Sequence, residues 1–251
     1  MLPIVLSHRF KLGRLLTVNV PAMLVLRRVL MCSSVLATLL CAGCVGNVLG
    51  GSGPPPNLYT LTPKSTYPDG LPEVASQLAI EESLAFGGLD ASRIVLKPKP
   101  TEVKYFGGVR WTERAPKMLQ TLLIESFENT GKIVSVGREA IGLRSDYSLK
   151  TELREFQAEY FGGADTPIVR VRINVKIVRQ PRQLIIASRS FERVVRVDQS
   201  GMAPIIEAFD NALGTVLKDL VQWTLITIHE QGDARLGNHY ELVLRGRNGH
   251  G

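Results

Sequence analysis

The side chain with the clearest chemistry is the thiol of Cys44, at the end of Leu40-Cys41-Ala42-Gly43-Cys44. An apolar run from Val29 to Leu40 precedes this segment, and Arg27-Arg28 precede the run. A positive segment, a short apolar segment and small residues in this order are the layout of an export signal. The thiol directly after the small residues is therefore a candidate for covalent modification during export.

The segment ending in Cys44 resembles the lipobox of bacterial lipoproteins. The resemblance implies cleavage between Gly43 and Cys44, so that residues 1–43 are a signal peptide. It also implies a diacylglyceryl group on the Cys44 thiol and an acyl chain on its new amino terminus. Cys41 departs from the pattern, because Leu is usual three residues before the acceptor. Cys41 and Cys32 are poorer acceptors, since large residues precede them.

An ordinary cleaved signal and a retained membrane anchor are the alternatives for this segment. A transmembrane helix needs about 20 apolar residues, and the glycines and prolines between residues 43 and 56 end the apolar run sooner. A start at Met23 would give a signal of standard length, and residues 1–22 would then be an over-extended gene start. Residues 44–57 predict a flexible tether, because a Gly- and Pro-rich segment cannot pack.

Processing at Cys44 changes the charge of the chain. The formal net charge is +7, from 30 basic and 23 acidic residues. Five basic residues and no acidic ones lie in residues 1–44, so the mature chain carries +2 (the five are Arg9, Lys11, Arg14, Arg27 and Arg28). The basic character therefore gives little support for a nucleic-acid partner, and none is expected. The mature chain keeps one cysteine, capped by lipid, so neither a disulfide nor a thiol nucleophile is expected.

The rest of the chain contains no recognisable catalytic set. The histidines after Cys44 have no partner at a metal-ligand spacing. The serines lack the Gly-x-Ser-x-Gly motif, and the glycine pairs lack the Gly-Lys-Ser/Thr ending of a phosphate loop. Glu152 and Glu155 lie among basic residues on a predicted strand, which is typical of cross-strand ion pairs. We expect a protein that is not an enzyme and has no metal or cofactor beyond the lipid on Cys44.

Residues 105–116 hold three aromatic side chains ahead of a predicted helix, in a predicted loop. Trp, Tyr and Arg supply most interface anchors, so Tyr105, Phe106, Trp111 and Arg114 are candidate partner-binding residues. The alternative for Trp111 is that it caps the domain core. A second candidate surface is a basic strip made of Arg170, Arg172 and Lys176, which would face acidic lipid or protein. The alternative is that these residues lie on an ordinary solvated sheet face.

Hydrophobic periodicity predicts the elements that carry these residues. Apolar residues at helical spacing predict helices at 116–129 and 202–228, whereas 73–84 has only weak helical spacing. Short strands are expected at 58–61, 93–96 and 133–136. Three longer strands at 148–160, 168–178 and 184–197 have short connections, which favour an antiparallel meander.

The predicted fold is a two-layer α+β domain over residues 58–230. Its sheet is expected to be mostly antiparallel, with the two main helices packed on one face. The polar, Gly-rich residues 231–251 are expected to be a disordered tail.

The order of these features resembles the ABC-type transport auxiliary lipoproteins, which accompany Mce-domain and paraquat-inducible-type lipid transport systems. The resemblance spans residues 57–230. It rests on Tyr59-Thr60-Leu61-Thr62-Pro63 after the lipidated cysteine, the strand near Ile94 and the Trp-centred segment 105–116. The strands from Tyr147 and the closing helix complete it. The departures are Cys41 and the polar tail.

The resemblance implies a periplasm-facing lipoprotein that serves a phospholipid or hydrophobic-compound transporter without being an enzyme. Its partners would be an Mce-domain protein and the ABC permease and ATPase of the same system, and a homo-oligomer stays open. Val45, in place of an Asp retention signal, favours the outer membrane. The alternatives are an assembly lipoprotein of an outer-membrane secretion or polysaccharide-export machine, and a lipidated hydrolase, which would need a polar triad or metal site.

Overall fold

The computed structural model describes residues 54–139 and 144–247, with side chains as far as residue 232. Cys44, the signal peptide and most of the tether lie outside the described residues. The described elements, all within the compact unit Pro55–Gly251, are β1 (Asn57–Tyr59), β2 (Val74–Ile80), β3 (Leu84–Ala85), the 3₁₀ turn η1 (Gly87–Leu89), β4 (Arg93–Lys99), β5 (Glu102–Trp111), α2 (Ala115–Glu128), β6 (Ile133–Arg138), β7 (Tyr147–Glu159), the 3₁₀ turn η2 (Phe161–Gly163), β8 (Ile168–Arg179), β9 (Leu184–Arg196) and α3 (Met202–Arg247).

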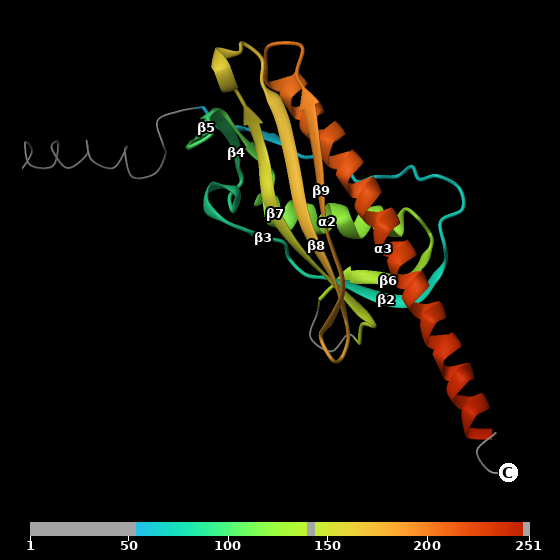
Figure 1. The fold of residues 1–251 in the computed structure, drawn as a ribbon. Coiled ribbons are helices and arrows are strands. Elements are labelled where there is room, and N and C mark those ends of the chain that lie inside the picture. The colour runs from blue at the N-terminus through green and yellow to red at the C-terminus, as the bar shows by residue number, and fades with distance from the viewer. Residues whose placement is uncertain (1–53, 140–143, 248–251) are drawn as a thin grey trace, which may run out of the picture. The chain divides into compact units, whose positions relative to one another are not determined.

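The strands form one mixed sheet around the long strand β7 (Figure 1). One side of β7 pairs in succession with β2, β3 and β4, all parallel, and its other side pairs with β8. The pairs β1–β5 and β2–β6 are also parallel. Only β4–β5, β7–β8 and β8–β9 are antiparallel among the described pairings. The prediction of a mostly antiparallel sheet is therefore wrong.

The antiparallel meander predicted for the three long strands is confirmed. In β8, Val169, Val171, Ile173, Val175 and Ile177 alternate with polar residues and are all fully buried. A register shift between Leu153 and Glu155 marks an irregularity in the pairing of β7 with β8.

Helices α2 and α3 cover the apolar face of the meander (Figure 1). Pro116 lies in the first turn of α2, where its missing N–H costs nothing. The buried stripe of α2 includes Leu119, Leu123 and Phe127, and α3 adds a longer stripe that includes Phe209 and Leu217. Full burial of one such side chain contributes about 1.5–3 kcal/mol relative to exposure. This layer of side chains is the core of the domain.

Two segments fold differently from their sequence-based expectation. Residues 73–84 contain β2, because β2 lies between β6 and β7 and its apolar residues are buried by both neighbours and α2. Residues 102–111 form β5 rather than a loop, since their backbone pairs with β4 and β1. Neither segment shows a clear alternation, so tertiary pairing decides its conformation.

Helix α3 continues beyond its predicted end to Arg247. The backbone of residues 231–247 is therefore helical, whereas the sequence predicts a disordered tail over 231–251. Across the described part of the chain, no helix combines the length and the apolar character that crossing a bilayer requires.

Candidate interaction face

The predicted lipidation and cleavage residues, Cys44 and Gly43, lie outside the described residues, so their roles stay predictions. The four candidate partner-binding residues are described, and the structure separates them. Trp111 lies in the core, Tyr105 and Phe106 are half-buried, and Arg114 is exposed.

Trp111 ends β5 with only 2% of its surface exposed. Its ring packs 5.4 Å from that of Phe156 on β7 and 5.3 Å, edge to face, from that of Phe209 on α3. These three rings close the core where β5, β7 and α3 meet. The partner-surface interpretation is thus corrected for Trp111, because an anchor must be reachable by the partner.

Tyr105 instead supports η1. Its hydroxyl oxygen lies 3.5 Å from the carbonyl oxygen of Gly88, and the Arg93 guanidinium lies 3.7 Å from the centre of its ring. A side chain at position 88 would meet the tyrosine, since a Cβ there would lie 2.7 Å from the hydroxyl oxygen. Gly88 therefore allows η1 to approach β5 closely.

Arg114 holds the segment after η1. Its guanidinium Nε donates to Oδ1 of Asp90 at 2.9 Å, and its Nη1 lies 3.1 Å from Oε1 of Glu82. Hydrogen bonding to Asp90 is the main cause that raises the pKa of Arg114. Tyr105 contacts Gly88 and Arg114 contacts Asp90, so both side chains hold the short segment around η1.

Phe106 packs elsewhere, because neighbouring residues of a strand point to opposite faces. Its ring lies 6.4 Å from that of Tyr160, edge to face, and contacts the core. Burial raises the pKa of Tyr160.

The turn η1 borders a hollow of ≈ 240 Å³ on the sheet face that lies opposite the helices. We call it the η1 hollow; its lining is Phe86, Gly87, Gly88, Leu89, Val95, Lys97, Val103, Arg154, Glu155 and Gln157. Phe86 and Val103 are 69% and 51% exposed at its rim, and the adjacent Leu84 is 62% exposed. Large apolar side chains gathered at a hollow mark an interaction site more often than scattered ones do. Sequence reasoning missed this site; its signal is Phe86 standing directly before Gly87-Gly88.

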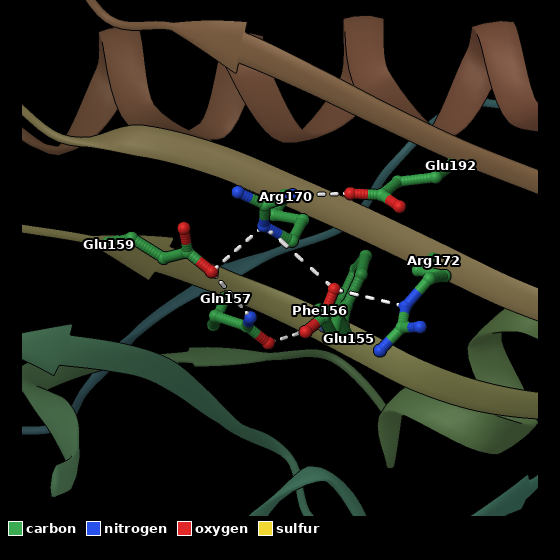
Figure 2. Close-up of polar contacts among 7 residues, drawn as sticks. All are labelled: Glu155, Phe156, Gln157, Glu159, Arg170, Arg172 and Glu192. Atoms are coloured by element: carbon green, nitrogen blue, oxygen red, sulfur yellow. Dashed lines mark hydrogen bonds and ion pairs between the residues drawn. The ribbon is translucent and has the colours of Figure 1, made fainter. Parts of the chain in front are cut away.

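The same sheet face carries an ion-pair network centred on Arg170 (Figure 2). The Nε of Arg170 donates to Oε1 of Glu159 at 3.0 Å, and its Nη1 pairs with Glu192 on β9. Glu155 lies 3.8 Å from Arg170 and 3.1 Å from Arg172. Hydrogen bonding to Glu159 is the first cause that raises the pKa of Arg170. The network therefore ties together β7, β8 and β9.

These contacts decide between the two interpretations of the predicted basic strip. Arg170 and Arg172 are each paired with carboxylates, so these two do not form a basic surface. Lys176, the third residue of the predicted strip, is exposed and pairs with no carboxylate among the described residues. Glu155 forms the predicted cross-strand pair, with Arg172, whereas Glu152 pairs with Arg154 of its own strand. Glu159 is 4% exposed and its Oε2 has no hydrogen-bond partner among the described residues. No group of three His, Cys, Asp or Glu residues in the described segments is arranged to hold a metal ion.

Comparison with known proteins shows the family and the fold. The family model described as "ABC-type transport auxiliary lipoprotein component" matches residues 59–221, from the end of β1 into α3. A crystal structure of a protein from Xanthomonas campestris is 32% identical with a TM-score of 0.66, covering 71% of this chain and 99% of that chain. A crystal structure of another protein has a TM-score of 0.54 at 14% identity, covers 68% and 99% of the two chains, and shows the fold alone.

A relative from Bradyrhizobium diazoefficiens is 28% identical over 181 residues. The match covers 71% of this chain and 48% of that protein, so the chain spans about half the length of this curated relative.

Proposed function

This chain belongs to the family of ABC-type transport auxiliary lipoprotein components, and from that premise we propose that it is the membrane-anchored, non-enzymatic auxiliary subunit of an envelope transport system. The observation that carries the proposal is the family match across nearly the whole described domain. The transporter would move phospholipid or another hydrophobic compound. Its other subunits would be an Mce-domain protein, a permease and an ATPase.

The described surface supports a binding role. The charged groups of the Arg170 network pair with one another, and three exposed apolar residues, Leu84, Phe86 and Val103, lie at the η1 hollow. Apolar side chains on a rigid sheet suit contact with another protein, because little conformational entropy is lost on binding. Tyr105 and Arg114 would serve this contact by fixing η1, and Phe106 by packing the edge of the sheet.

The lipid on Cys44 would keep the domain at the membrane. One acyl chain binds a bilayer only weakly and reversibly, whereas two or more chains give stable anchoring, at about 0.8 kcal/mol per buried CH₂. A tether of residues 44–57 would let the domain reach on the order of 40 Å from the surface at about 3.3 Å per residue. The outer membrane is the proposed location, because Val45 is not an Asp retention signal.

Crosslinked affinity purification of the full-length chain from its own cells tests the proposal. Recovery of an Mce-domain protein together with an ABC permease or ATPase is the expected result. The control is the same purification with the Cys44→Ser variant, which should recover less of these partners because the unprocessed precursor stays in the inner membrane. Recovery of a secretin or polysaccharide-export protein instead would contradict the transport role and favour an assembly role.

A further inference from the structure

The structure leaves one long strand edge without a backbone partner. Strand β9 spans Leu184–Arg196 and pairs along one side only, with β8 over its whole length. Among the described residues its other side has no strand neighbour. An exposed edge presents a row of free N–H and C=O groups, and proteins normally keep such edges short, covered or interrupted.

Most side chains of strand β9 are also exposed. Phe191 is its only buried residue; it packs edge to face on Trp223 of α3 at 5.5 Å. Leu184, Ile185 and Val194 are 55%, 54% and 39% exposed. Helix α3 packs against this strand, and Ile186, Ala187 and Val195 are half-buried against the core, but the arginines of the strand stay exposed.

The unpaired charge on this edge is positive. Arg189, Arg193 and Arg196 are exposed, and none of them takes part in an ion pair within the described residues. Arg189 lies over the Phe191 ring, with its guanidinium 5.1 Å from the ring centre. The acidic residue of the strand, Glu192, is held by Arg170.

From these features we infer that β9 receives an acidic, extended segment of a partner protein as an additional strand. Edge addition gives affinity through backbone hydrogen bonds and specificity through alternate side chains. Arg189, Phe191 and Arg193 alternate on one face, because β9 pairs them with the inward-facing residues Val175, Ile173 and Val171 of β8. A strand that fits would carry acid, apolar and acid residues at alternate positions opposite these three.

A second copy of this chain fits the edge less well. Antiparallel pairing of two β9 strands centred on Phe191 would place Arg189 opposite Arg193, and like charges directly opposite are unfavourable. Registers that place Glu192 opposite an arginine of the second copy would compete with the ion pair between Glu192 and Arg170. Charge complementarity therefore favours a different, acidic partner.

The test uses a photo-crosslinking residue at Ser190 of the full-length chain in its own cells. Ser190 is exposed on β9 and leaves Arg189, Phe191 and Arg193 intact. The expected product joins β9 to a segment of another protein with the acid-x-apolar-x-acid pattern. The same crosslinker at Asn211, an exposed position on α3, should not give this product.

Charge reversal provides the second arm of the test. Arg189→Glu with Arg193→Glu should lower the crosslink yield about tenfold, since two cross-strand pairs change from attractive to repulsive. The matched control, Arg110→Glu with Arg182→Glu, reverses two exposed arginines elsewhere and should leave the yield unchanged. The inference is overturned if the product joins two copies of this chain, if its segment lacks acidic residues, or if charge reversal has no effect.

A guarding role for the arginines would also overturn the inference. Charged residues on an edge strand can serve only to prevent self-association. In that case Arg189→Gln with Arg193→Gln would make the chain self-associate in sedimentation while the Ser190 crosslink stayed unchanged. Loss of the crosslink without self-association supports the docking edge.

Discussion

At the residue scale, Trp111 links the three parts of the core. It ends β5, contacts Phe156 on β7 and Phe209 on α3, and is 2% exposed. A substitution at this position should therefore change the stability of the whole domain rather than partner binding.

Trp111→Ala should lower the free energy of unfolding by about 3–5 kcal/mol, because it leaves a large cavity. Urea denaturation measures this change. Trp223→Ala is the control, and its cost should be smaller because Trp223 is half-buried. If Trp111→Ala keeps normal stability but binds its partner less well, Trp111 is an interface residue instead.

The Arg170 network allows a matched comparison of two arginines. Arg170→Ala should cost about 3 kcal/mol, because it strips the charged partner from Glu159, whose side chain is 3% exposed. Arg172→Ala should cost about 1 kcal/mol or less, since Arg172 and Glu155 are 41% and 25% exposed. The two urea midpoints decide the ranking, and equal costs would show that burial of Glu159 is not the deciding factor.

At the element scale, the connection between β1 and β2 is fixed by side chains. Thr62 donates its backbone N–H to Oδ1 of Asp210 on α3 at 2.7 Å. Lys64 donates its backbone N–H to Oγ of Ser126 on α2 at 2.9 Å, and Tyr67 donates to the Ser126 carbonyl oxygen at 2.9 Å. A segment without helix or strand thus holds both helices together.

Tyr67→Phe removes one of these bonds and should cost about 1 kcal/mol. Burial raises the pKa of Tyr67 to about 12 from 10.0. The unfolded chain therefore loses the Tyr67 proton before the folded chain does, so stability falls as pH rises from about 10 to 12. Urea denaturation on both sides of about pH 10 should show a smaller fall for Tyr67→Phe than for the wild type.

The control for this pH effect is Tyr59→Phe. Tyr59 also packs half-buried against the core, so Tyr59→Phe removes a phenol hydroxyl without touching the bond between Tyr67 and Ser126. An equal effect of both variants would mean that the alkaline loss of stability does not come from Tyr67.

The elements also show which structural features the sequence can predict. Helices α2 and α3 and the meander β7–β8–β9 are predicted because their apolar spacing is clear and their connections are short. The parallel pairs of β7 with β2, β3 and β4 are not predicted, since they join segments far apart in the chain. The η1 hollow is missed for the same reason: Phe86, Val103 and Glu155 meet only after these pairs form.

At the scale of the whole molecule, the family resemblance predicted from the order of elements is confirmed by the family match. The match ends at residue 221 within α3 and begins at residue 59, after the tether. The cellular location is therefore predicted from residues outside the matched domain, above all from Cys44.

Cys44→Ser should leave an unprocessed precursor in the inner membrane, because acylation precedes cleavage in the pathway that the lipobox implies. Membrane fractionation and the mass of the chain measure both effects. Cys41→Ser is the matched control and should be processed normally. Outer-membrane recovery of a processed Cys44→Ser chain would refute lipidation at this residue.

The self-contained pairing of charges around Arg170 has a kinetic consequence. A face whose charges cancel within a few ångströms exerts little attraction at a distance, so a partner that docks at the η1 hollow must arrive by unassisted collision. The unpaired arginines of β9 attract over a Debye length, about 10 Å at 0.1 M salt and about 3 Å at 1 M. Association through the edge should thus slow as ionic strength rises, whereas association through the hollow should not.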